Sequence, residues 1–146
     1  MNQTFDVIQV GDVATPLFFK VDQHVIQLYA EASGDFNPLH VDPEFAKSSK
    51  FGNTIAHGMM TLAFISQAMM SQNSYGWLNG GILDVSFISP IFPGDEIQVR
   101  AGVREKRTDS RTVIYDVSVV KGTGEMVVKG TCVIAFPEDG RGKRVH

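Results

Sequence analysis

Two side chains that can exchange protons near neutral pH lie close together early in the chain, Asp35 and His40. An imidazole titrates in this range, so a carboxylate and a histidine held side by side can share a proton transfer. Pro38 lies between them and lacks a backbone donor, and Gly34 precedes them, so irregular backbone is expected here. Loops between ordered elements often hold reactive groups. The spacing therefore predicts an acid–base pair.

The same residues also fit a structural role. Asp and Asn side chains often accept hydrogen bonds from backbone N–H groups two residues on, which forms an Asx-turn. Asp35 and Asn37 would then cap the element that follows them. The residue types alone leave the reactive pair and the capping turn equally open.

A metal site is a third interpretation, because imidazoles and carboxylates are common ligands. It would draw on two histidines and two aspartates: His40, His57, Asp35 and Asp42. Their spacing fits no standard closed site, and Asp42 directly precedes Pro43, which favours an N-cap role for Asp42. The sequence therefore predicts no metal and no other cofactor.

A long apolar run follows His57 and Gly58 and is expected to form a buried helix over residues 58–70. The first turn of a helix has unpaired N–H groups and a partial positive charge, so the Gly58 N–H would stabilise a carbonyl oxygen that gains negative charge. Each residue also has a structural alternative. Gly58 would be a small residue where the helix meets the sheet, and His57 would be a core histidine that is hydrogen-bonded to the backbone. Ser66, on the same helix, would bond either into a cavity or to the preceding turn.

The remaining elements divide the chain into a helical half and a strand half. Asp22 is the expected N-cap of a helix with Val25, Leu28, Tyr29 and Ala32 on one face. After Gly80 and Gly81 the apolar period changes to that of strands, expected at 82–89, 96–104, 113–119 and 125–136, with a short N-terminal strand at 5–10 or 17–21. Long antiparallel strands and one apolar helix predict an α+β, hot-dog fold, a curled sheet wrapped around a central helix.

Length and composition set further bounds. The 146 residues suit one domain, 1–146, of which 137–146 is expected to be a flexible tail. The net charge of −3 argues against nucleic acid as a partner. Residues 1–11 lack a basic start followed by an apolar run, so no signal peptide is expected there. No apolar run reaches the roughly 20 residues that cross a membrane, and Cys132 is the single cysteine. We therefore expect a cytoplasmic protein without a membrane partner.

Three blocks of the chain resemble a known family. Residues 29–43 (YAEASGDFNPLHVDP) closely resemble the hydratase signature of MaoC-like, (R)-specific enoyl-CoA hydratases. Residues 55–59 (IAHGM) resemble the second block of that family, and residues 87–95, with Pro90 and the Pro-Gly-Asp turn, resemble its third. The first block is long enough to be specific.

The resemblance implies a hot-dog fold, a homodimer or a larger assembly, and reversible hydration of an enoyl thioester carried by CoA or by acyl carrier protein. Asp35 and His40 match the catalytic pair of the family, and Gly58 matches the glycine whose N–H polarises the thioester carbonyl. Asn37 and Ser66 match supporting positions, and His57 is a further substrate-binding or supporting candidate. No metal or redox cofactor is implied.

Two other activities remain possible for a hot-dog protein. A thioesterase would need an acid that activates water at the carbonyl carbon, and the predicted helix has no Asp or Glu between Met59 and Met70. A non-catalytic acyl-CoA binding module would gain little from placing two titratable groups, Asp35 and His40, in its site. Hydration is therefore the preferred hypothesis.

Overall fold

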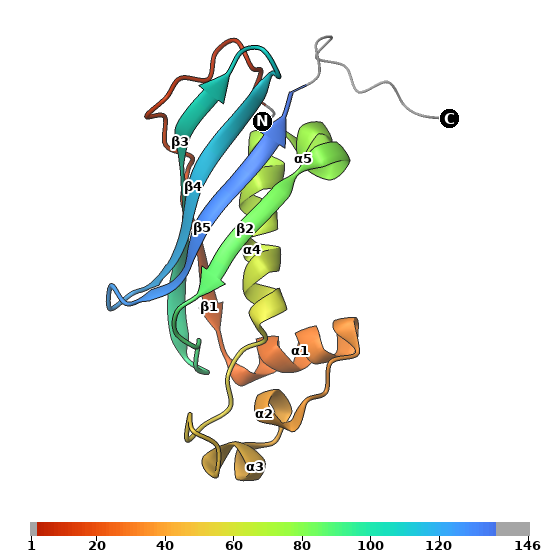
Figure 1. Cartoon of the computed structure of the whole chain (residues 1–146). Helices are drawn as coiled ribbons and strands as arrows, with labels where there is room; N and C mark the ends of the chain where they lie inside the picture. Colours follow the sequence, from red (N-terminus) through yellow and green to blue (C-terminus); the bar gives the residue numbers. More distant parts are fainter. Residues whose placement is uncertain (1–2, 137–146) are drawn as a thin grey trace.

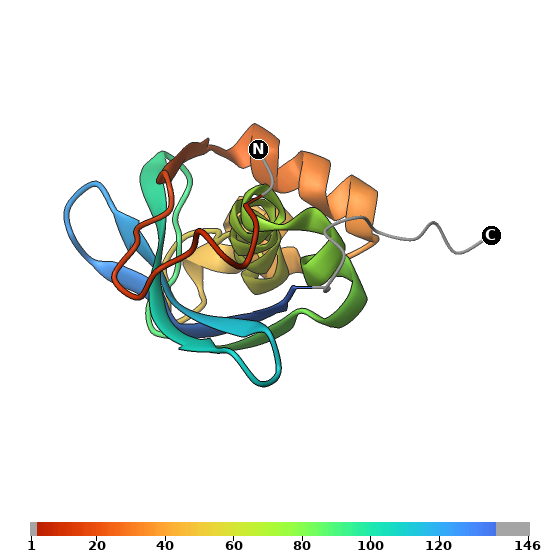
Figure 2. The same ribbon diagram turned by 90° about the horizontal axis from the view of Figure 1, so that it is seen from above.

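The computed structural model describes residues 3–136. Five strands form one antiparallel sheet in the order β1-β3-β4-β5-β2, so β1 and β2 are its edges. The strands are β1 (Leu17–Val21), β2 (Ile82–Phe87), β3 (Asp95–Arg107), β4 (Thr112–Lys121) and β5 (Met126–Ala135). Helix α4 (Gly58–Gln72) runs along the inner face of the sheet (Figure 1), and the sheet curls around one side of it (Figure 2). This is the predicted α+β, hot-dog architecture.

The inner face of the sheet is apolar along the central strands, as predicted. Ile97, Val99, Ala101 and Val103 of β3 and Val113, Tyr115, Val117 and Val119 of β4 are all buried. Alternate residues of a strand point to the same side, and the register places Val99 beside Val119, so both sets face α4. A bulge between Val103 and Glu105 shifts the register near one end of β3.

Helix α4 is only partly covered. Met60, Ile65, Ala68 and Met69 are buried against the sheet. The side chain of Met59 is 62% exposed, and Ala63 and Gln67 are exposed as well. The prediction that this helix is wrapped on every side is therefore wrong for the single chain, because the sheet covers one side of the helix only.

The other helices are α1 (Gln23–Ser33), α2 (Pro38–Val41), α3 (Pro43–Lys47) and α5 (Ser74–Gly80). Asp22 caps α1 as predicted, since its side chain accepts a hydrogen bond from the Val25 N–H at 2.8 Å. The predicted inward face is shifted, however: Ile26 and Ala30 are the buried residues of α1. Val25 and Tyr29 only flank this stripe, and Leu28 and Ala32 lie on its exposed side.

At the N-terminus, residues 17–21 form β1, which pairs with β3. Residues 5–10 form no strand, although Phe5 and Ile8 are buried. The predicted tail at 137–146 lies outside the described residues. Among the helices within 3–136, none has both the length and the apolar character needed to cross a bilayer.

Candidate active site

The segment that holds the candidate residues lies at the N-terminal end of α4, where α1, α2 and α3 gather below the sheet (Figure 1). Asp35 lies in the link between α1 and α2, His40 in α2, and His57 is the N-cap of α4. One carboxylate oxygen of Asp35 and one ring nitrogen of each histidine lie within 4.8 Å of one another. The fold therefore brings Asp35 and His40 together, as the acid–base prediction requires.

Asp35 and Asn37 also form the capping turns that the sequence left open. The Asp35 Oδ1 accepts a hydrogen bond from the Asn37 N–H at 3.1 Å, and the Asn37 Oδ1 accepts one from the Leu39 N–H at 3.0 Å. Asn37 is thereby the N-cap of α2, the single helical turn that holds His40. The two interpretations are compatible, because the caps orient the segment on which Asp35 and His40 lie. Between Ser33 and His40, only residues 34–37 are irregular, so the irregular segment is shorter than predicted.

His40 is held at one ring nitrogen and at its backbone. Its Nδ1 lies 2.7 Å from the Ile55 carbonyl oxygen. A carbonyl can only accept, so Nδ1 carries the proton and Nε2 is the nitrogen left for chemistry. The Gln23 Nε2 donates to the His40 carbonyl at 2.9 Å, and the Gln23 Oε1 accepts from the Thr54 hydroxyl at 2.6 Å. Gln23 thus ties α1 to both segments that fix His40.

His57 is a core histidine bonded to backbone, as one prediction had it. It is 1% exposed, and its Nε2 lies 2.9 Å from the Asp35 carbonyl oxygen. Its ring stacks on that of His40, with 3.9 Å between the centroids and 29° between the planes. The Tyr29 ring packs against it at 4.9 Å.

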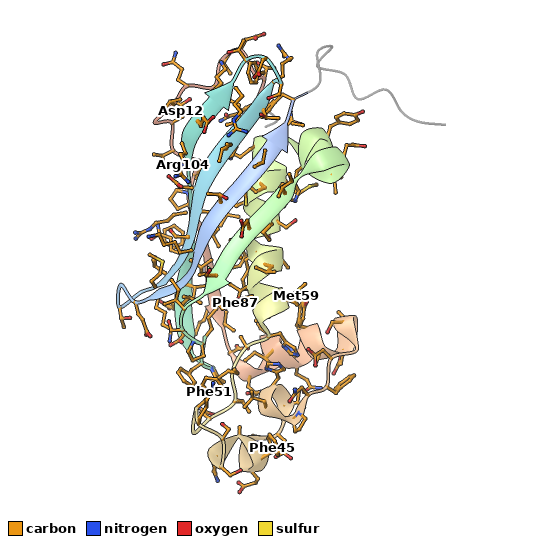
Figure 3. All side chains as sticks on the ribbon, viewed as in Figure 1. Asp12, Phe45, Phe51, Met59, Phe87 and Arg104 are labelled. Atoms are coloured by element: carbon orange, nitrogen blue, oxygen red, sulfur yellow. The ribbon has the colours of Figure 1, made fainter. Side chains whose placement is uncertain are left out.

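Gly58 is the first residue of α4, so its N–H has no acceptor within the helix. A Cβ atom at this position would lie 3.0 Å from the Phe87 ring, so the close approach of β2 favours glycine. A groove of 360 Å³ lies beside Gly58 and has a mostly apolar lining that includes Phe51, Ile55 and Phe87, with Lys50 also contributing. Figure 3 shows Phe87 and Met59 at this end of α4.

Ser66 lies farther along α4. Eight residues separate it from Gly58, about 12 Å of helix. The Ser66 Oγ accepts a hydrogen bond from the Trp77 indole N–H at 2.8 Å, which joins α4 to α5. The sequence predicted a hydrogen bond from Ser66 into a cavity or to the preceding turn, and Trp77 of α5 is neither of these partners.

The three clustered side chains could also coordinate a metal ion. Asp35, His40 and His57 each offer one ligand atom. One ring nitrogen of each histidine bonds a backbone carbonyl, which leaves the second nitrogen as the possible ligand. Asp42 takes no part, because its Oδ1 caps α3 by accepting from the Glu44 and Phe45 N–H groups.

Sequence reasoning missed three contributors to the site: Gln23, Thr54 and the Ile55 carbonyl. A backbone carbonyl has no sequence signal. Gln23 had a weak sequence signal, because a long polar side chain in the first turn of α1 is well placed to reach a neighbouring segment. Nothing in the local pattern marks Thr54, which is buried only through tertiary contacts.

Comparisons with known proteins identify the family of this chain. The profile of the family described as MaoC like domain matches residues 11–125. An (R)-specific enoyl-CoA hydratase of Aeromonas caviae is 33% identical over 115 residues, which are 77% of this chain and 84% of that protein. A mitochondrial 3-hydroxyacyl-(acyl-carrier-protein) dehydratase of Arabidopsis thaliana is 32% identical over 129 residues, 84% of this chain and 73% of that protein.

Solved structures give the same result. An R-hydratase of Pseudomonas aeruginosa, in its unliganded form, superposes with a TM-score of 0.79 at 30% identity, covering 94% of this chain and 88% of that one. The family profile spans α1–α4, the whole candidate site and most of the sheet. The chain is therefore a member of the MaoC like domain family.

Proposed function

We propose that this protein is an (R)-specific enoyl-CoA hydratase, which adds water reversibly to a trans-2-enoyl thioester to give the (R)-3-hydroxyacyl thioester. The observation that carries the proposal is the closeness of the Asp35 carboxylate and the His40 imidazole, within 4.8 Å, at the N-terminal end of α4. Family membership supports a hydro-lyase, because the relatives are named hydratases and dehydratases.

The separation suits a shared water molecule. Hydrogen bonds between oxygen or nitrogen atoms are about 2.8 Å long, so one water can bond two atoms up to roughly 5.6 Å apart. Asp35 and His40 lie closer than this limit. Both can therefore hold the same water while an enoyl thioester lies beside it.

The reaction needs one proton acceptor and one proton donor. As the water oxygen bonds to C3, its proton passes to one member of the pair, and the other member supplies a proton to C2. At His40 the exchanging atom is Nε2, because Nδ1–H is engaged by the Ile55 carbonyl. Asp35 and His40 act as one unit, so a pH profile reports the pair.

The carbonyl oxygen of the substrate would accept a hydrogen bond from the Gly58 N–H. Negative charge that moves onto the thioester oxygen is then stabilised at the positive end of α4. The neighbouring 360 Å³ groove provides room for part of the thioester. Asn37 supports the pair by capping α2, and Ser66 supports the site by fixing α4 against α5 through Trp77. The carrier is CoA or acyl carrier protein, and the hydration chemistry needs neither metal nor redox cofactor.

A homodimer fits the uncovered surfaces. Within residues 3–136 one side of the edge strand β2 is unpaired, with Ile82 59% and Phe87 57% exposed, and α4 leaves Met59 uncovered nearby. Exposed apolar residues along a free strand edge favour pairing with another chain. A second copy along β2 would cover both surfaces. The cytoplasmic location stays a prediction.

The direct test is hydration of crotonyl-CoA by the wild type and by Asp35→Asn and His40→Ala, followed as loss of the enoyl thioester absorbance. General acid–base groups contribute about 10²- to 10⁴-fold to rates, so each variant should lose at least 10²-fold in kcat. His24→Ala is the matched control, because His24 is exposed on α1. Product analysis should give the (R)-3-hydroxy enantiomer.

Other results would identify the rival activities. Near wild-type rates in both folded variants would refute the assignment of Asp35 and His40. Release of free CoA thiol from an acyl-CoA without hydration would identify a thioesterase. Tight binding of acyl-CoA without turnover at any chain length would identify a binding module. A series of enoyl-CoAs of increasing length would then define the acyl chain that the site accepts.

A further inference from the structure

One buried side chain touches both halves of the reactive pair. His57 bonds the Asp35 carbonyl through Nε2, and its ring stacks on the ring of His40. It also directly precedes Gly58, the first residue of α4. His57 therefore joins the segment of Asp35, the ring of His40 and the helix end that would receive the substrate carbonyl.

The surroundings of His57 fix where its proton lies. Its Nε2 faces a carbonyl oxygen, which only accepts, so Nε2 carries the hydrogen. Its Nδ1 is buried and has no hydrogen-bond partner within residues 3–136. A proton on Nδ1 would be a buried donor without an acceptor, which is costly. His57 is therefore held as the neutral Nε2–H tautomer.

The neighbouring histidine has the opposite arrangement. His40 donates through Nδ1–H to the Ile55 carbonyl and keeps Nε2 for exchange. A neutral ring 3.9 Å away lets His40 become charged during the reaction, whereas a second cation at that distance would oppose it. Of the two stacked rings, only His40 is arranged to transfer a proton.

We propose that His57 is a positioning residue for hydration, an inference that rests on the proposed function. Through the hydrogen bond it fixes the backbone of Asp35, and through the stack it fixes the ring plane of His40. It transfers no proton itself. Two links from one rigid, buried side chain keep the pair at the spacing that a shared water needs.

Two substitutions separate the two links. His57→Gln places its amide nitrogen where Nε2 stands and so keeps a donor for the Asp35 carbonyl, but it lacks the ring. His57→Phe keeps an aromatic ring against His40 but has no donor. His24→Gln and His24→Phe are the matched controls on the exposed face of α1.

Each His57 variant should lose about 10- to 100-fold in kcat on crotonyl-CoA, the loss typical when a group that orients a metal ligand is removed, with KM nearly unchanged. His57→Ala, which breaks both links, should lose more than either. Circular dichroism and thermal melting check that the variants fold. Wild-type kcat in both His57→Gln and His57→Phe would overturn the positioning role, as would a loss confined to KM.

A measurement on the wild type needs no variant and no turnover. In protein with ¹⁵N-labelled histidine, NMR should show His57 with its proton on Nε2 and His40 with its proton on Nδ1. A proton on Nδ1 of His57 would overturn the inference. If the wild type hydrates no enoyl thioester, the proposed function fails, and the tautomers alone then decide whether His57 holds the pair as described.

Discussion

At the residue scale, two buried groups predict how stability depends on alkaline pH. Burial raises the pKa of the Cys132 thiol from 9.0 to about 12, and burial together with the charge of Asp12 raises the pKa of Tyr115 from 10.0 to about 12. The unfolded chain releases these protons at lower pH than the folded chain. Their contribution to stability is therefore complete below about pH 9 and is lost as the pH rises toward 12.

Replacing Tyr115 tests this dependence. The Tyr115 hydroxyl is buried and lacks a partner among the described residues, so Tyr115→Phe should leave the free energy of unfolding at pH 7 unchanged or raise it. The variant should also lose less stability between pH 10 and 11, by up to about 1.4 kcal/mol per pH unit. Urea unfolding at each pH measures both effects, with Tyr75→Phe as control. If the free energy of unfolding falls equally with rising pH in the wild type and in Tyr115→Phe, the proposed contribution of Tyr115 to this pH dependence is wrong.

Metal removal addresses the cluster of Asp35, His40 and His57. If acid–base hydration is correct, dialysis against a chelator should leave kcat on crotonyl-CoA unchanged, because no step needs a Lewis acid. Elemental analysis of the dialysed protein verifies that metal is gone. Activity that disappears with the metal and returns when Zn²⁺ or Fe²⁺ is added would instead show a metal-dependent reaction, with these three side chains as the candidate ligands.

At the scale of the elements, two short helices offer a matched comparison. Asn37 caps α2, which holds His40, and Asp42 caps α3, which holds none of the candidate residues. Asn37→Ala and Asp42→Ala should each cost about 1 kcal/mol in the free energy of unfolding. Only Asn37→Ala should also lower kcat, because α2 positions His40, and Asn37→Asp should restore it.

Denaturant unfolding and steady-state kinetics on the same preparations separate the two effects. An equal fall of kcat in Asp42→Ala would mean that α3 also positions the reactive pair. Unchanged kcat in Asn37→Ala would mean that the cap is dispensable for orienting His40.

The predictable and the missed parts of the site differ in their physical origin. Local rules located the caps at Asp22 and Asp42, because a cap depends on residues only two or three positions away. The same rules misplaced the inward face of α1, since two overlapping apolar stripes exist and tertiary packing selects Ile26 and Ala30. The anchoring of His40 to Ile55 depends on a contact distant in sequence, which no local pattern describes.

At the scale of the whole molecule, strand alternation predicted the sheet well, because each central strand has one buried face. The uncovered side of α4 was not predictable, since an evenly apolar helix has no periodic signal that marks its exposed side. That exposed side, together with β2, is the surface on which a second chain is expected.

An edge substitution tests the homodimer. Ile82→Lys places a positive charge on β2 of both chains, so repulsion should shift the protein toward monomer. Phe18→Lys makes the equivalent change on β1, the opposite edge, and should leave assembly unaffected. Sedimentation velocity over a range of concentrations measures the mass of the wild type and of both variants. A wild type that is monomeric throughout, or dissociation by Phe18→Lys alone, would rule out pairing along β2.

The proposed reactive groups come from one continuous stretch, residues 35–58, whereas four of the five strands follow it in the chain. The candidate site and most of the sheet are thus encoded in separate parts of the chain. Substitutions in the sheet can reshape the space for an acyl chain without disturbing Asp35 or His40. A duplicated domain can likewise lose the side chains of residues 35–58 that carry the chemistry and still keep all five strands, including the edge strand β2 proposed to pair in the dimer.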